Sequence, residues 1–236
     1  MPRVVVFTGA GISAESGIKT FRDSDGLWEE YSIMDVATPE AWKRNPELVL
    51  RFYNERRKQM RLAQPNPAHL ALARLQEFMP VDIVTQNVDD LHERAGSKNV
   101  MHLHGELSKV RSEIYPLPLY DAGAREIQLG DLCERGTQLR PHVVWFGEEV
   151  PMIEPAAKLV AKADILIVVG SSLNVYPAAG LLYNATYGCR KILIDPSENV
   201  SGGIFRLTHI QEKAGTGVPK IVDELIAEFV NETDQS

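Results

Sequence analysis

The chain has 236 residues, of which 44% are hydrophobic and 24% are charged, and its formal net charge is −7. This length can bury a substantial core, and the negative net charge argues against a nucleic-acid binder that relies on bulk attraction to phosphate, although a local basic patch stays open. No apolar run approaches the roughly 20 residues needed to cross a bilayer, and we expect no secretory leader. The two cysteines, Cys133 and Cys189, lie far apart, which argues against a disulfide framework and favours the cytoplasm.

A β-branched run followed by glycines stands at the start of the predicted fold. The run 4–7 leads directly into Gly9, Gly11 and Ala14, which form the pattern G-x-G-x-x-A before residues that can open a helix. Glycines permit a tight turn and let backbone N–H groups approach an anion, and a helix N-terminus adds positive potential. The motif alone leaves nucleotide binding and a plain tight turn equally open.

Short apolar runs that end in polar residues or glycine predict strands. They begin at Val4, Val81, Val100, Val143, Ile165 and Lys191. Most are continuous rather than alternating, as in parallel strands covered on both faces, and helical patterns at 67–78 and 155–163 lie between them. We therefore predict an α/β fold with a doubly wound, mostly parallel, Rossmann-like sheet.

The polar residues that follow these strands indicate where a ligand would bind. In a doubly wound sheet, ligands lie in the crevice beyond the carboxyl ends of the strands. We therefore expect one set of strand-end side chains to converge: Thr8, Gln86, Asn87, Asp89, His104, Ser171, Ser172 and Asp195. Their convergence would be stronger evidence for a site than the glycine motif.

Two excursions interrupt the strand–helix alternation. Residues 20–63 contain no clear strand pattern. They contain a predicted helix with Asn45 as N-cap and Pro46 in the first turn, which runs to about Leu62. For most of its basic residues we expect a solvated face. These residues are Arg51, Arg56, Arg57, Lys58 and Arg61.

The second excursion, residues 108–139, contains the proline-broken run YPLPLYDAG and predicts a small module. A helix at 218–230 ends the chain, followed by a polar tail that we expect to fray. We predict one domain over 1–236. Its Rossmann-like part comprises about 1–19, 64–107 and 140–230, and its small lobe comprises about 20–63 and 108–139.

The glycine motif departs from the fingerprint of an ordinary dehydrogenase. In that fingerprint a second strand follows within about 30 residues and carries an acidic residue that binds the ribose. Here the next credible strand begins at Val81, and Glu29, Glu30 and Asp35 lie in no predicted strand. Hydride transfer is therefore disfavoured, whereas nucleotide binding is not.

Five long segments distributed along the chain carry a family resemblance. They are GAGISAESGIKTFR from Gly9, TQNVDDLHERAGS from Thr85, HLHGEL from His102, RPHVVWFGEEVP from Arg140 and GSSLNVYPAAGL from Gly170. These segments resemble the sirtuins, the NAD-dependent protein lysine deacylases, and are close to bacterial sirtuins of the CobB type (class III). The resemblance implies NAD as co-substrate, transfer of the acyl group from lysine to ADP-ribose, and release of nicotinamide and O-acyl-ADP-ribose.

The same resemblance assigns roles around the cofactor. His104 would be the general base that deprotonates a ribose hydroxyl, while His102 is left as a structural histidine. Asn87 and Asp89 match the nicotinamide pocket, with Asn87 counted as catalytic and Asp90 left as a solvated or capping residue. The other positions matched to the NAD site are Gly9, Ala10, Gly11, Ser13, Glu15, Thr20, Phe21, Arg22, Trp28, Gln86, Val88, Gly170, Ser171, Ser172, Asp195 and Ala214. Leu193 stands where many relatives carry an asparagine.

Substrate residues follow from the same comparison. Tyr53 and Arg56 are three apart on the predicted helix and share a face. They resemble the Tyr-x-x-Arg of sirtuins that accept negatively charged acyl groups, with Ala37 leaving room, and a guanidinium can hold a carboxylate bidentately. We therefore expect activity on succinyl- or malonyl-lysine as well as acetyl-lysine. A strand edge for peptide binding by β-addition is expected at Val144, Phe146 and Gly147.

Zinc is not expected, although relatives usually carry four cysteines between HGEL and RPH. That interval has only Cys133, Ser112 follows KVR, and His102 and His142 offer no convincing substitute for a tetrahedral thiolate site. We expect apolar packing to hold the small module instead. The candidates are Ile114, Tyr115, Leu117, Leu119, Tyr120, Ile127 and Leu129.

Three other functions remain open from the sequence: an NAD(H)-dependent oxidoreductase, a non-catalytic module that binds NAD or ADP-ribose, and an NAD-dependent protein ADP-ribosyltransferase. None accounts for the full set of segments as well as deacylation. The expected partners are proteins or peptides that contain acyl-lysine, with no nucleic acid and no membrane, and a monomer is favoured.

Overall fold

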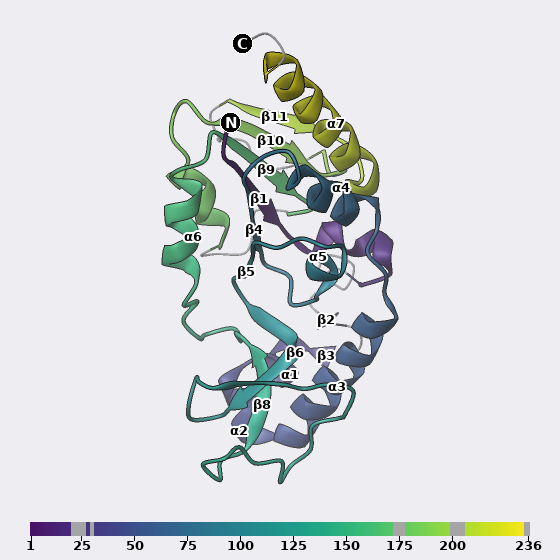
Figure 1. Cartoon of the computed structure of the whole chain (residues 1–236). Helices are drawn as coiled ribbons and strands as arrows, with labels where there is room; N and C mark the ends of the chain where they lie inside the picture. Colours follow the sequence, from purple (N-terminus) through teal and green to yellow (C-terminus); the bar gives the residue numbers. More distant parts are fainter. Residues whose placement is uncertain (20–26, 29–30, 172–177, 199–205, 234–236) are drawn as a thin grey trace.

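The computed structural model describes residues 1–19, 27–28, 31–171, 178–198 and 206–233. Six parallel strands form its main sheet in the order β11-β10-β9-β1-β4-β5 (Figure 1). Their bounds are β1 Val4–Thr8, β4 Val81–Thr85, β5 Val100–His102, β9 Ile165–Val169, β10 Arg190–Ile194 and β11 Leu207–Ile210. The predicted doubly wound α/β fold is confirmed.

Both faces of the main sheet are covered, which explains the continuous apolar runs. Helices α4 (Pro67–Leu75) and α7 (Ala214–Thr233) lie on one face, and α6 (Ile153–Val160) and the 3₁₀ helix η4 (Ala178–Asn184) lie on the other (Figure 1). Successive residues of β1 point to opposite faces, so Val4 and Val6 pack with the first layer and Val5 and Phe7 with the second.

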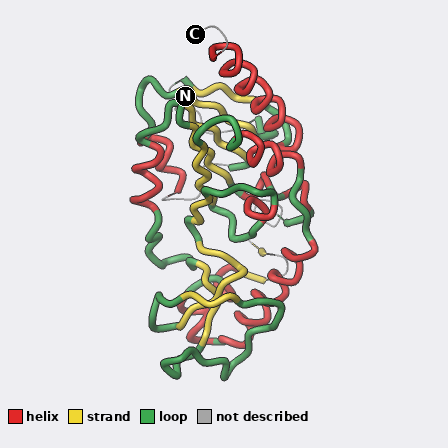
Figure 2. Tube along the Cα trace, in the orientation of Figure 1, coloured by secondary structure: helices red, strands yellow, loops and turns green. Residues whose placement is uncertain are grey.

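A second body lies beyond the carboxyl ends of the main strands. Strands β6 (Gly105–Ser112), β7 (Leu119–Asp121) and β8 (Leu139–Val143) form an antiparallel sheet in the order β7-β6-β8. Figure 2 shows these strands beside the helices α1 (Ile33–Val36), α2 (Pro39–Arg44) and α3 (Pro46–Leu62). We call this body, residues 33–62 and 105–145, the small lobe. Strands β2 (Leu27–Trp28) and β3 (Tyr31–Ser32) form a separate short pair.

The caps of the small-lobe helices fix where they begin. Asn45 Oδ1 accepts a hydrogen bond from the Leu48 N–H at 3.1 Å, and Pro46 occupies the first turn, so the predicted start and end of α3 are confirmed. Thr38 Oγ1 caps α2 in the same way, accepting from the Ala41 N–H at 3.0 Å.

The core of the small lobe joins two distant segments of the chain. Residues 36–60 contribute Trp42, Phe52 and Tyr53, and residues 107–145 contribute Val110 and Trp145. Most of the apolar residues predicted to hold this module are not in its core. Ile127 is buried, and Tyr120 packs against the cluster. Of the others, Leu119 is half-buried and four are exposed: Ile114, Tyr115, Leu117 and Leu129. The proline-broken run has no regular face to bury, and α3 fills the interior instead.

One strand prediction is wrong, and some strands were not predicted. The strand predicted from Val143 is wrong, because β8 ends at that residue and belongs to the antiparallel sheet. Strands β6 and β11 were not predicted, since both are partly exposed and polar residues interrupt their apolar positions. Helix α7 starts at Ala214, earlier than expected, and continues to Thr233.

Two cations of α3, Arg56 and Arg57, are buried rather than solvated. Arg57 is only 2% exposed; its Nε donates to the Leu107 carbonyl at 2.8 Å and its Nη1 to Asn54 Oδ1 at 2.9 Å. Burial lowers the pKa of Arg57 to about 10. Arg57 therefore ties α3 to β6, while Arg51, Lys58 and Arg61 are exposed as predicted, and Arg56 is buried at the cavity described below.

Within the described residues, no helix is both long enough and apolar enough to span a bilayer. Cys133 and Cys189 are both free thiols, as the sequence predicts.

Candidate active site

The turn after β1 packs directly on the turn after β9. The N–H of Gly9 donates to the Val169 carbonyl at 3.0 Å, and the N–H of Gly11 donates to the Gly170 carbonyl at 2.9 Å. A Cβ on Gly11 would lie 2.6 Å from Gly170 Cα, and Gly170 has φ +60°, a region that favours glycine. The glycines are therefore required for this contact between loops.

The expected helix after the glycine motif is replaced by two short 3₁₀ turns, η1 (Ala10–Ile12) and η2 (Ala14–Ser16). The sequence left open whether the backbone N–H groups of this turn approach an anion. Those of Gly9 and Gly11 donate to the neighbouring loop instead. Because both N–H groups are already hydrogen-bonded to the loop after β9, they are not available to a ligand.

A cavity of about 680 Å³ lies where these turns meet the small lobe. Most of the predicted strand-end residues line it. They are Gln86, Asn87, Asp89, His104, Ser171 and Asp195. The other predicted residues on its wall are Gly9, Ala10, Gly11, Ser13, Glu15, Val88, Gly170, Ala214, Ala37, Tyr53, Arg56, Val144, Phe146 and Gly147.

Some predicted residues are not on this wall. Thr8 is fully buried beneath it and does not line the cavity, so its predicted place at the rim is wrong. Thr20, Phe21, Arg22 and Ser172 lie outside the described residues, and so does the side chain of Trp28.

A compact hydrogen-bonded group follows β4. Ser13 Oγ donates to Asp89 Oδ2 at 3.0 Å, and Asn87 Nδ2 donates to Ser13 Oγ at 3.1 Å and to the Gly9 carbonyl at 3.2 Å. Asp89 Oδ1 accepts from the Leu91 N–H at 3.1 Å. Burial raises the pKa of Asp89, although these two hydrogen bonds act against the shift. The amide and carboxyl groups are thus fixed on the cavity wall.

His104 lines the cavity in a defined tautomer. Its Nδ1 lies 3.0 Å from the Gln86 carbonyl oxygen, which only accepts, so Nδ1 carries the hydrogen and Nε2 keeps its lone pair. Burial lowers the pKa of His104, although the hydrogen bond to Gln86 opposes this. The imidazole is therefore neutral at pH 7, with a basic nitrogen at Nε2.

His102, two residues earlier, is held differently. Its Nδ1 donates to the Asn87 carbonyl at 2.9 Å, and its Nε2 lies 2.8 Å from Glu93 Oε1. Burial opposes the charged form, but the hydrogen bond and charge of Glu93 raise the pKa of His102 overall. His102 does not line the cavity, and both of its ring nitrogens are engaged by neighbouring groups. Asp90, left as a solvated or capping residue, pairs with Arg94 at 3.5 Å.

A chain of buried polar groups supports the loop from below. The Thr8 hydroxyl donates to Thr85 Oγ1 at 2.8 Å, so Thr8 Oγ1, 3.1 Å from His92 Nε2, accepts from it. Thr85 Oγ1 also accepts from the Asn87 N–H at 3.0 Å. The ring of His69 packs edge-on against His92 with 4.9 Å between ring centres. Neither Thr8 nor His92 touches the cavity, yet both act on the position of Asn87.

The end of the cavity within the small lobe is formed by Ala37, Tyr53 and Arg56, which the fold brings together as predicted. Segment 144–147 beside them is not a strand, so the prediction of a strand edge is wrong. The N–H of Val144 donates to the His104 carbonyl and that of Phe146 to the Ala37 carbonyl, both at 2.9 Å. These donors hold the segment in place and are not available to pair with an added strand.

At the opposite end, the cavity reaches β10 and α7. Glu15 Oε2 accepts from the Gly215 N–H at 2.7 Å, which joins η2 to the start of α7 beside Ala214. Asp195 Oδ1 accepts from the Ser197 N–H at 3.0 Å. Leu193 is buried in the core and does not line the cavity.

Four polar or aromatic residues on the wall, Lys19, Trp145, Glu148 and Lys213, were missed from the sequence. The only signals for them are their positions beside predicted residues: Trp145 between Val144 and Phe146, and Lys213 before Ala214.

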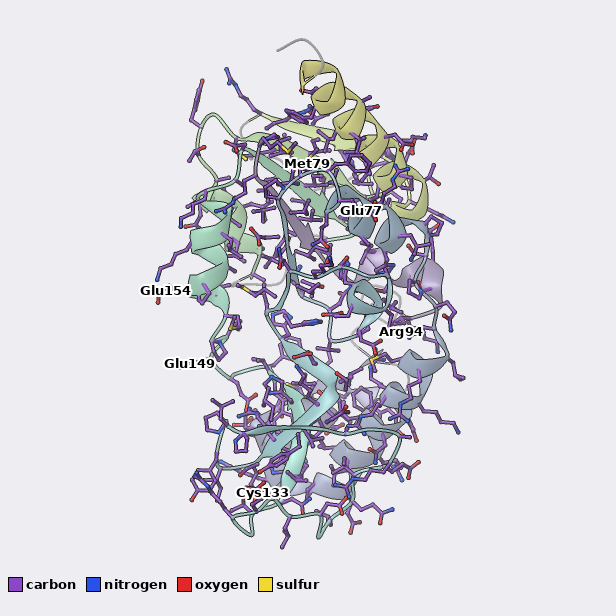
Figure 3. All side chains as sticks on the ribbon, viewed as in Figure 1. Glu77, Met79, Arg94, Cys133, Glu149 and Glu154 are labelled. Atoms are coloured by element: carbon purple, nitrogen blue, oxygen red, sulfur yellow. The ribbon has the colours of Figure 1, made fainter. Side chains whose placement is uncertain are left out.

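Cys133 has hydroxyl rather than thiolate neighbours. Its Sγ lies 3.0 Å from Thr137 Oγ1, which lies 2.6 Å from Ser112 Oγ. Figure 3 labels Cys133 at the far end of the small lobe, away from the main sheet. Among the residues that the structure describes, no group of three or more His, Cys, Asp or Glu side chains is arranged to hold a metal ion.

Comparisons with known proteins agree with this geometry. A model of the Sir2 family matches residues 9–177, more than half of the chain. An NAD-dependent protein deacylase of Helicobacter pylori is 55% identical over 226 residues, covering 96% of this chain and 98% of its own, and one of Bacteroides thetaiotaomicron is 51% identical, covering 96% and 99%. The crystal structure of a Sir2 homologue in complex with NAD superposes with a TM-score of 0.85 at 40% identity, covering 96% of this chain and 90% of the other.

The two packed imidazoles predict a pH dependence of stability. Burial lowers the pKa of His69 to about 4, with Glu93 opposing, and lowers that of His92 well below its usual value. Between pH 6.5 and 4 the unfolded chain binds protons that the folded chain does not, so stability falls as pH falls. His69 alone accounts for about 3 kcal/mol across that window. Urea unfolding at several pH values should show this loss. It should be smaller in His69→Gln and absent between pH 8 and 7, and an unchanged loss in the variant would contradict the assignment.

Proposed function

The chain belongs to the Sir2 family, and from that premise we propose how its residues perform the reaction of an NAD-dependent protein deacylase. Relatives with that name cover almost the whole chain at 51–55% identity. The observation that carries the proposal is the position of one neutral imidazole, His104, on a cavity that runs from the glycine turns to Tyr53 and Arg56. The cavity thus has one end suited to a dinucleotide and another suited to an acyl chain.

The residues present fit NAD. The wall combines close-packed glycine turns, the carboxylates Glu15 and Asp195, and the polar groups of Gln86 and Ser171, joined by a hydrogen bond of 3.1 Å. NAD, when bound, supplies a ribose carbon that accepts the acyl oxygen as nicotinamide leaves. Asn87 and Asp89 are proposed to hold the nicotinamide end, because their amide and carboxyl groups are fixed on the wall by Ser13.

His104 is proposed as the general base. Nδ1 is occupied by the Gln86 carbonyl, so Nε2 is the nitrogen that takes a proton from a ribose hydroxyl. Its lowered pKa keeps the base unprotonated at neutral pH. The surrounding apolar wall, including Val144, Phe146 and Val150, would exclude water that otherwise competes for the reactive ribose.

The acyl range is proposed to include succinyl- and malonyl-lysine as well as acetyl-lysine. Ala37 is small, so the end of the cavity beside it has room for a longer chain, and both Tyr53 and Arg56 line that end. Arg56 is only 6% exposed, and a cation so shielded from water interacts strongly with a carboxylate.

We further propose that the small lobe holds no zinc. The interval from Ser108 to Leu139 contains one cysteine, and its neighbours Ser112 and Thr137 are not zinc ligands. Hydrogen bonds take the place of metal bonds here: Ser112 Oγ accepts from the N–H groups of Ile114 and Tyr115, both at 3.0 Å. We also propose that the chain is one catalytic domain and acts in the cytoplasm, where its two free thiols stay reduced.

Replacing the base tests the mechanism. His104→Ala should lower kcat/KM for deacetylation at least about 100-fold, because general base catalysis is lost, while NAD binding measured by calorimetry persists. The matched control is His102→Gln, which removes the neighbouring imidazole that does not line the cavity and should lose far less activity. Full deacylation by His104→Ala would refute the role of His104.

Replacing the guanidinium tests the acyl range. Arg56→Met should lower the ratio of desuccinylation to deacetylation about 10- to 100-fold, since a hydrogen bond to a charged group is lost. Lys58→Met, an exposed cation on the same helix, is the control and should leave the ratio unchanged. An equal loss of both activities in Arg56→Met would contradict the carboxylate clamp.

Metal analysis tests the zinc proposal. Purified protein should contain far less than one zinc per chain, and a strong chelator should leave its melting temperature unchanged, because no metal bond contributes to folding. Stoichiometric zinc, or a lower melting temperature with chelator, would contradict the proposal.

A further inference from the structure

Trp145 is held on three sides at the acyl end of the cavity. Its backbone N–H donates to Glu148 Oε2 at 2.8 Å, the Arg140 guanidinium lies 3.2 Å from the centre of its ring, and its indole Nε1–H donates to Tyr53 Oη at 3.0 Å. Arg140 is itself fixed, because its Nη1 and Nη2 donate to the two carboxylate oxygens of Glu148 at 2.7 and 3.2 Å. Trp145 is 2% exposed, so the indole has a single orientation toward Tyr53.

The hydrogen bond from the indole constrains the hydroxyl of Tyr53. An indole N–H only donates, so Tyr53 Oη is the acceptor in this pair. The phenol has one hydrogen of its own, and that hydrogen must point away from the incoming indole hydrogen. Burial raises the pKa of Tyr53, against the opposing effects of the Trp145 hydrogen bond and of the cations Arg140 and Arg56. The hydroxyl therefore stays protonated and keeps a hydrogen to donate.

We propose that Trp145 is a specificity-determining residue, because it turns the Tyr53 hydroxyl into a hydrogen-bond donor aimed into the cavity, where a carboxylate at the end of the acyl group accepts it. This inference rests on the proposed function and deepens it. Arg56, one turn further along α3, lines the same end and donates only. The two side chains thus select an acyl group that ends in acceptors.

A carboxamide with the same shape as the succinyl carboxylate distinguishes recognition by an oriented hydrogen-bond donor from simple attraction between opposite charges. A succinamyl group carries an NH₂ that needs an acceptor, and neither the oriented Tyr53 hydroxyl nor the guanidinium of Arg56 supplies one. If the indole N–H is removed, the Tyr53 hydroxyl can rotate, accept from that NH₂ and relax the discrimination. Trp145 acts through Tyr53 and is a positioning residue.

The experiment is a double-mutant cycle on three peptides that differ only in the acyl group of one lysine: acetyl, succinyl and succinamyl. Trp145→Phe keeps an aromatic ring for Arg140 and removes the N–H, and Tyr53→Phe removes the hydroxyl. We expect each variant to lower the succinyl-to-acetyl ratio of kcat/KM about tenfold, the value of one charge-assisted hydrogen bond. The double variant should fall no further than Tyr53→Phe alone, because Trp145 works only through that hydroxyl.

Several outcomes would overturn the inference. An unchanged succinyl-to-acetyl ratio in Trp145→Phe, or effects of the two substitutions that multiply in the double variant, would show that the indole does not act through the Tyr53 hydroxyl. If Trp145→Phe does not fold, Tyr53→Phe still decides the matter, since an unchanged ratio there means that the hydroxyl donates nothing to the acyl end. Wild-type protein that deacetylates but does not desuccinylate would instead refute the proposed acyl range, and the role of Trp145 with it.

Discussion

The contact between the turn at Gly9–Gly11 and the turn at Gly170 is the constraint on which the cavity depends. A side chain on either side would lie within 3 Å of opposing backbone, so glycine is needed at both. With the turns in contact, Asn87 reaches the Gly9 carbonyl and Gln86 reaches Ser171 Oγ. The loops after β1, β4 and β9 thus form one rim, which is held together by backbone contacts between the glycine turns and by side-chain hydrogen bonds.

His102 and His104 show that the same side chain can have different properties in different surroundings. His102 faces a carboxylate, Glu93, which favours its charged form and fixes it to the carbonyl of Asn87. His104 pairs with the carbonyl of Gln86 and is largely buried, so its neutral form is favoured and one nitrogen keeps its lone pair. The first therefore serves structure, and the second has the electronic state that a general base requires.

The sequence is most informative where burial alone decides the structure. Continuous apolar runs identify five strands of the main sheet, and the Asn45–Pro46 pair identifies the start of α3, because local residues are sufficient in both cases. Edge strands such as β11, and β6 with its alternating polar residues, do not carry that signal. The long-range polar contacts of Arg57, Thr8 and Trp145 were missed for a further reason. Their partners lie 50, 84 and 92 positions away, and nothing local marks them.

The two ends of the cavity are built by different parts of the chain. The glycine turns and the polar strand ends belong to the main sheet, whereas Ala37, Tyr53 and Trp145 come from two insertions that share one hydrophobic core. Because neither insertion contains that core alone, the proposed acyl pocket is complete only after both have been synthesised and have met. Evolution can therefore alter the size and charge of this pocket through a few residues of α3 and its neighbours without disturbing the backbone of the proposed nucleotide site. The same main sheet and cavity could in this way serve lysines that carry different modifications.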